Sequence, residues 1–137
     1  MNARSSGGTN LRSSLGRARG LGAANEGVHH WWTQRVTAIA LVPLGLWFVF
    51  AAISLMGADL AEFRAFFGIL GNALMMILLV LVMFYHAAIG MQVVIEDYLH
   101  GASRIIVLLA VKFALYAMAA SCVISVLWLG ARVLPPS

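Results

Sequence analysis

The sequence is poor in charged residues, and acidic residues are the scarcest. Only 5 of its 137 residues are Asp or Glu, against 9 Lys or Arg, and charged residues make up 10% of the chain. Soluble domains carry about a quarter charged residues, so an ordinary water-exposed surface is excluded. The single cysteine, Cys122, excludes a disulfide within the chain. No basic patch on a folded surface is indicated, so we expect no nucleic-acid partner.

Long uncharged runs take the place of charge. Hydrophobic residues make up 62% of the chain, and residues 36–58, 65–95 and 113–131 contain no Asp, Glu, Lys or Arg. Each run can supply the ~20 apolar residues that a membrane-spanning helix needs. The sequence therefore predicts an all-α membrane protein with three transmembrane helices, at roughly residues 32–56, 67–96 and 104–130. Together they form one unit over residues 23–137, with no soluble domain.

The N-terminal tail, residues 1–22, is rich in Gly, Ser and Arg, and we expect it to be disordered. Its arginines predict a cytoplasmic N-terminus by the positive-inside rule, and three spans then place the C-terminus outside. Asp97 and Tyr98, which follow the second run, would face the cytoplasm. The tail's composition is also typical of a mitochondrial transit peptide, so the alternative to a disordered cytoplasmic tail is a targeting segment.

His86 lies inside the longest uncharged run, and Asp97 follows eleven residues later. A helix returns to nearly the same angular position after eleven residues, so both side chains share one face about 16 Å apart along the axis. This spacing places His86 near the middle of the bilayer and Asp97 at one interface. An ionisable residue at that depth is a candidate functional site.

Two interpretations of His86 are consistent with the sequence. A zinc or copper site needs several ligands close together, whereas haem needs only one from this chain if a partner supplies the other. Gly90, one turn further along, would leave space for a porphyrin. Alternatively, His86 is a structural residue hydrogen-bonded to a neighbouring helix, and Gly90 a site of close helix packing.

Basic and aromatic residues also cluster where the first predicted helix begins. His29, His30 and Arg35 flank Trp31 and Trp32. Such a cluster is suited to an anion such as a haem propionate, and equally to anchoring the helix in anionic lipid.

Two ordered motifs resemble one known family. The segment from His86 to Met91, followed by Asp97 and Tyr98, resembles the His-Ala-x-x-Gly-Met and Asp-Tyr residues of the hydrophobic membrane-anchor subunit of bacterial succinate dehydrogenase. Gly-Val-His at residues 27–29 and Arg-Val-Thr-Ala-Ile at residues 35–39 are similar to the family's segments before its first helix. The resemblance covers roughly residues 20 to 130.

The resemblance implies a role for each matching residue. His86 is similar to an axial ligand of haem b, whose other ligand comes from a partner cytochrome b subunit. His29 and Arg35 are similar to family residues near the haem propionates. Tyr98 is similar to the donor to a ubiquinone carbonyl, and Asp97 is its polar neighbour. The implied fold is a haem-binding helical bundle shared with that cytochrome b subunit.

The implied function is that of a membrane anchor in succinate:quinone oxidoreductase of the bacterial inner membrane. An iron-sulfur subunit and a flavoprotein subunit would carry out succinate oxidation, and this chain would dock them and help form the quinone site. The alternatives are an anchor of a quinol:fumarate reductase and a structural scaffold without a cofactor. His30 and His100 have no firm family counterpart. Lys112 is expected to extend its ammonium toward lipid headgroups, and the alternative is contact with an anionic lipid or with the soluble part of the complex. Pro43 interrupts the first helix, where a kink is expected.

Overall fold

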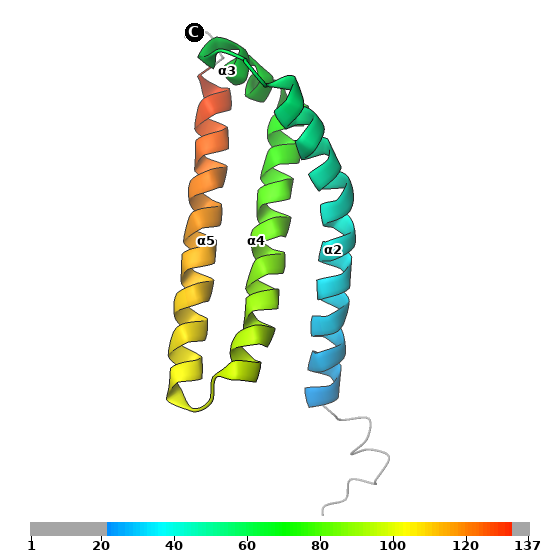
Figure 1. The fold of residues 1–137 in the computed structure, drawn as a ribbon, viewed down its shortest axis with the longest axis vertical. Coiled ribbons are helices and arrows are strands. Elements are labelled where there is room, and N and C mark those ends of the chain that lie inside the picture. The colour runs from blue at the N-terminus through cyan, green and yellow to red at the C-terminus, as the bar shows by residue number, and fades with distance from the viewer. Residues whose placement is uncertain (1–21, 133–137) are drawn as a thin grey trace, which may run out of the picture.

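The structure, a computed structural model, describes the backbone of residues 22–132 and the side chains of residues 27–132. Four helices account for nearly all of it: α2 (Gly22–Ser54), α3 (Leu60–Gly68), α4 (Leu70–Tyr98) and α5 (Ala102–Ala131). The described residues contain no strand, and the all-α fold is confirmed (Figure 1).

Three of the helices are long and apolar enough to cross a membrane, as the sequence predicts. The candidate spans are Gly27–Ser54, Leu70–Tyr98 and Ala102–Ala131. At 1.5 Å per residue, α4 is about 43 Å long, which exceeds a hydrocarbon core of about 30 Å. The helix α2 begins at Gly22 rather than near residue 32, so the predicted tail, residues 1–22, lies outside the described residues except for Gly22.

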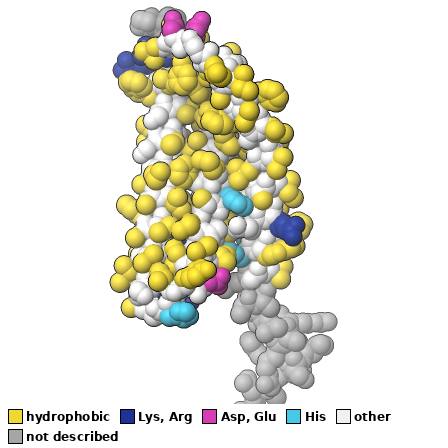
Figure 2. Space-filling model, in the orientation of Figure 1, with side chains coloured by type: hydrophobic (Ala, Val, Ile, Leu, Met, Phe, Trp, Pro, Cys, Tyr) yellow, Lys and Arg dark blue, Asp and Glu magenta, His cyan; other side chains and the backbone are white. Residues whose placement is uncertain are grey.

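The helix α4 lies between α2 and α5 and packs against both (Figure 1). Within the described residues, the backbones of α2 and α5 do not approach each other closely. Val80 and Phe84 of α4 form a buried cluster with Ala119 of α5. Most other large apolar side chains are exposed, and hydrophobic atoms cover the face seen in Figure 2. Since exposed apolar surface of this extent is unfavourable in water, these faces are suited to lipid or to other membrane helices.

The short helix α3 was not expected from the sequence, which indicated only a loop between the first two spans. A capping box starts this helix: the Asp59 carboxylate accepts from the Glu62 amide at 2.8 Å, and Glu62 accepts from the Asp59 amide at 3.1 Å. Reciprocal bonds of this kind satisfy amides that a helix start otherwise leaves unpaired. Its Phe67 is buried, and the backbone of Gly130 in α5 approaches it closely. The helix thus closes one end of the bundle.

The connection between α4 and α5 is short and depends on a glycine. Gly101 has φ of 71°, a conformation that side-chain-bearing residues rarely adopt. The chain reverses there, and α5 runs back antiparallel beside α4 (Figure 1). In α2 the helix continues through Pro43 to Ser54, and its second half leans toward α3 in Figure 1.

Candidate functional site

His86 lies twelve residues before the end of α4, about 18 Å along the helix from Tyr98. Its imidazole is half-buried and faces α2, where the Thr37 hydroxyl lies 2.8 Å from Nδ1. The contact joins two helices, and the residues are 49 positions apart in the chain. The ring is therefore held by an interhelical hydrogen bond deep within the apolar part of the bundle.

The Thr37 hydroxyl can take part in this hydrogen bond in either direction, depending on the tautomer of His86. Its hydroxyl oxygen also lies 2.8 Å from the carbonyl of Thr33 and 3.1 Å from that of Gln34. A hydroxyl has one hydrogen to donate, and a carbonyl can only accept. When Thr37 donates to its own helix, its oxygen accepts from the His86 Nδ1–H. The neutral ring then carries its lone pair on Nε2, which has no hydrogen-bond partner among the described residues.

Gly90 lies at the contact between α4 and α2. A Cβ placed on it would lie 3.5 Å from Nε2 of the Gln34 side chain. The space beside Gly90, which the sequence suggested for a porphyrin, is thus next to Gln34 in the structure. Gln34 Oε1 is buried and has no partner among the described residues. Sequence reasoning did not single out Gln34, because a polar residue near a helix end is ordinary.

His29 and Arg35 are not brought together. Six residues separate them, so they point about 120° apart around α2. The guanidinium of Arg35 lies 5.1 Å from the ring centre of Trp31, and both side chains are exposed. His29 instead lines a cavity against α4 and α5, together with His30. His29 is exposed as well, but of His29 and Arg35 only His29 lines this cavity.

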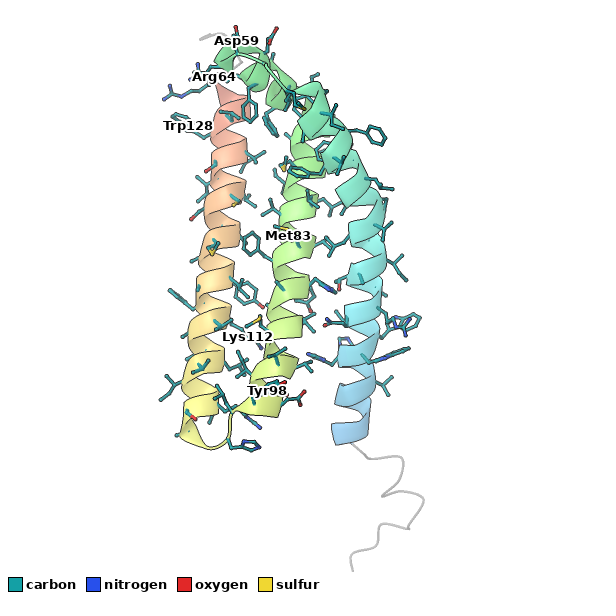
Figure 3. All side chains as sticks on the ribbon, in the orientation of Figure 1. Asp59, Arg64, Met83, Tyr98, Lys112 and Trp128 are labelled. Carbon is teal, nitrogen blue, oxygen red and sulfur yellow. The ribbon has the colours of Figure 1, made fainter. Side chains whose placement is uncertain are left out.

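Asp97 and Tyr98 are the last two residues of α4, and both are exposed. The Tyr98 side chain is 81% exposed and lies at the end of the bundle opposite α3 (Figure 3). His100 follows in the turn to α5 and is also exposed. Because this end of the described chain is open, a quinone pocket there would need walls from another subunit.

A polar chain links α5 to α4 near the same end. The Lys112 ammonium donates to Gln92 Oε1 at 2.8 Å, and the Gln92 amide donates to Glu96 at 2.9 Å. Lys112 is half-buried and lies between the two helices in Figure 3. The expected extension toward lipid headgroups did not include this partner on α4. In the sequence, the i, i+4 spacing of Gln92 and Glu96 predicts that these two side chains can pair on one helix face. This spacing gives no information about a partner on another helix.

Comparison with known proteins gives the family. A family model described as succinate dehydrogenase/fumarate reductase transmembrane subunit matches residues 9–128. The succinate dehydrogenase hydrophobic membrane anchor subunit of Rickettsia bellii is 36% identical over 89 residues, or 65% of this chain and 71% of that protein. That of Paracoccus denitrificans is 36% identical over 87 residues, or 64% of this chain and 67% of that protein.

A longer match links the chain to the corresponding anchor subunit of Rickettsia conorii, which is 29% identical over 117 residues, or 80% of this chain and 90% of that protein. No solved structure matches the chain significantly. The family model covers most of the chain, including all three spans up to residue 128, and the resemblance noted in the sequence is confirmed. The chain belongs to the family of succinate dehydrogenase/fumarate reductase transmembrane subunits.

Proposed function

We propose that this chain is a membrane-anchor subunit of a succinate:quinone oxidoreductase, in which it docks an iron-sulfur subunit and a flavoprotein subunit. The names of its relatives support the anchor role. The described residues form three apolar spans joined by short connections, so they offer no domain for dicarboxylate chemistry. In this proposal the dicarboxylate is oxidised on the soluble partners. This chain helps to bind the haem and the quinone that receive the electrons.

His86 is the proposed axial ligand of haem b, shared with a partner cytochrome b subunit. The observation that carries this role is the match of the segment from His86 to Met91, with Asp97 and Tyr98, to the family motif. The Thr37–His86 hydrogen bond is compatible with it, although the structural interpretation of His86 predicts the same contact. Iron binding by histidine requires a neutral ring with a free lone pair, and a second residue that fixes the other nitrogen improves the ligand. Haem b, when bound, would accept and release single electrons. The chain's own contribution is a ring whose orientation is fixed before the haem arrives.

His29 and Arg35 are the proposed contacts of the haem propionates, as the family resemblance implies. The support differs between the two. His29 lines the cavity beside α4, whereas Arg35 would have to leave the ring of Trp31 or act through a partner subunit on the outer side of α2. Guanidinium groups bind carboxylates through paired hydrogen bonds, so Arg35 retains the chemistry that the role needs.

Tyr98 is the proposed hydrogen-bond donor to ubiquinone, with Asp97 beside it. A tyrosine hydroxyl is neutral and can donate one hydrogen bond to a carbonyl. As negative charge develops on the quinone oxygen, that bond strengthens and lowers the barrier. The exposure of Tyr98 at the end of α4 is consistent with a pocket completed by other subunits.

We also propose that the protein lies in the bacterial inner membrane, with the Tyr98 end of the bundle on the cytoplasmic side. The arginines of the N-terminal tail support this orientation through the positive-inside rule. The soluble partners would then dock at the same end as the proposed quinone site. A quinol:fumarate reductase anchor would use the same parts in the opposite direction, but the relatives are named for succinate dehydrogenase.

The experiment that tests the haem role is the substitution His86→Leu in the assembled complex. Leucine keeps the span apolar, so the helix should still insert. We expect the reduced haem b spectrum to be lost or strongly altered, since one axial ligand is removed. His100→Leu, at the exposed turn, is the matched control and should leave the spectrum unchanged. An unaltered spectrum and reduction potential in His86→Leu would contradict the ligand role of His86 and assign the axial ligands to other residues.

A further inference from the structure

A groove runs along α4 on the side where α2 and α5 flank it with their backbones apart. Two adjoining cavities of about 490 and 350 Å³ occupy this groove. Tyr85 of α4 and Tyr116 of α5 line both cavities, so the two adjoin at these side chains. We call this feature the α4 groove.

The two cavities differ in chemistry. The first, nearer the Tyr98 end, is lined by polar side chains from all three helices, among them His29, His30, Gln92 and Lys112. The second lies deeper and is lined mainly by apolar side chains such as Leu81 and Val82. The groove therefore passes from a polar, basic end to an apolar end.

The polar end lies near the boundary between lipid headgroups and hydrocarbon. The helix α4 exceeds a 30 Å core by about 13 Å, so roughly 7 Å extends beyond it at each end if α4 is centred. Gln92, six residues before Tyr98, is about 9 Å from the helix end and thus just inside this boundary. Lys112 lies at the same level, because its ammonium is 2.8 Å from Gln92 Oε1.

Lys112 retains the ability to bind a further ligand. An ammonium has three hydrogens to donate, and Gln92 takes one of them. His30, which lines the same cavity, has a buried Nε2 with no partner within the described part of the chain. Tyr85 and Tyr116 also line this cavity. Several donors around one cation are suited to an anionic oxygen group.

We propose that the α4 groove binds an anionic phospholipid, with its phosphate against Lys112 and an acyl chain along the second cavity. The positive charge at headgroup level matches the phosphate, and the apolar branch matches the acyl chain. His86 lines neither cavity, and Tyr85 and Gln92 lie about 100–120° from it around α4. His29, the proposed propionate contact, and Thr37, the partner of His86, do line the groove, so the phosphate is assigned to Lys112 and not to His29. A quinone is neutral and does not need the cation. This inference goes beyond the proposed electron-transfer function.

The test compares lipid retained by purified assembled complexes that carry substitutions at Lys112. The complexes are loaded from vesicles of phosphatidylglycerol, washed, and examined by native mass spectrometry. Loss of a charge-assisted hydrogen bond should weaken retention roughly tenfold or more in Lys112→Met. Lys112→Arg keeps the charge and should retain the lipid. Arg104→Met removes a cation from the same helix outside the groove and should also retain it.

A second substitution tests the apolar branch independently of the charge. Leu81→Trp adds bulk to the second cavity and should lower phosphatidylglycerol retention even if Lys112→Met fails to assemble. Zwitterionic phosphatidylcholine should bind more weakly than phosphatidylglycerol to the parental complex. Equal retention in Lys112→Met and the parental complex overturns the proposal. Loss of haem in Lys112→Met would instead assign the groove to the haem carboxylates, and loss of a membrane subunit would assign it to a partner helix.

Discussion

Thr37 Oγ1 lies 2.8 Å from His86 Nδ1, and this hydrogen bond joins α2 to α4 within the apolar part of the bundle. The Thr37 hydroxyl is within reach of carbonyls on its own helix, so its oxygen is free to accept from the imidazole. Accepting from Nδ1–H increases the basicity of Nε2, which favours the ferric state of a bound haem iron.

We therefore expect Thr37→Val to raise the reduction potential of haem b. Valine keeps the branched shape but removes the acceptor, so Nε2 becomes a weaker donor to iron. The rise should be up to roughly 60 mV, which corresponds to a tenfold change for one electron. A potentiometric titration of the haem absorbance measures it.

Thr33→Val is the matched control, because the Thr33 hydroxyl donates to the His29 carbonyl at 2.8 Å and has no recorded contact with His86. Its potential should equal that of the parental complex. Equal potentials for both valine variants would show that Thr37 does not act on the iron. If the haem role of His86 were wrong, His86→Leu would leave the spectrum intact, so the two failures are distinguishable.

The three spans were predictable because charged side chains are costly in lipid, so each span must be a continuous uncharged, hydrophobic run. Such a run is visible in the sequence without knowledge of any tertiary contact. His86 was identifiable for the same reason, since an ionisable side chain stands out in an uncharged run. The pairing with Thr37 was not, although Thr37 lies within a motif that resembles the family. It depends on the register between two helices whose residues are 49 positions apart.

The helix α3 and Lys112 illustrate a second limit. The capping box of Asp59 and Glu62 is a recognisable helix start, but α3 has only nine residues, and a helix this short is marginal without tertiary packing. Lys112 has a partner on α4 that only the packing of α4 against α5 provides. In both cases the missing information is the contact between elements, not the preference of the residues.

The packing of α3 against α5 predicts an effect on stability. A Cβ on Gly130 would lie 2.9 Å from the carbonyl oxygen of Phe67, and backbone cannot move aside as a flexible side chain would. Gly130→Ala should therefore destabilise the protein by about 1–3 kcal/mol. Gly45→Ala, with no atom near its Cβ, should leave stability unchanged or raise it slightly. Thermal unfolding in detergent compares the two, and equal midpoints would contradict the close packing.

The proposed orientation predicts where fused reporters lie. A reporter after Ser137 should be periplasmic and one inserted near Gly101 cytoplasmic, because one span separates the two positions. Paired alkaline phosphatase and fluorescent-protein fusions measure the two locations. Reporters on the same side would contradict three spans, and the reverse assignment would contradict the cytoplasmic N-terminus.

Tyr98 provides a test of the quinone role that is separate from the haem. It lies twelve residues beyond His86, about 120° around α4 and 18 Å along it, so its removal should leave the haem spectrum nearly intact. Tyr98→Phe deletes only the hydroxyl. If that hydroxyl binds a quinone carbonyl, its loss should cost about 1–3 kcal/mol, or roughly a five- to hundred-fold decrease in quinone reductase activity.

Two measurements on Tyr98→Phe and one control variant distinguish the roles. Succinate oxidation by a soluble artificial acceptor should match the parental rate, because that reaction bypasses the quinone site. Tyr116→Phe is a matched control on α5, since its hydroxyl lines the α4 groove rather than the end of α4; its quinone reductase activity should be unchanged. Parental quinone reduction by Tyr98→Phe would mean that Tyr98 is an exposed interfacial residue and that the hydrogen bond to quinone comes from another subunit.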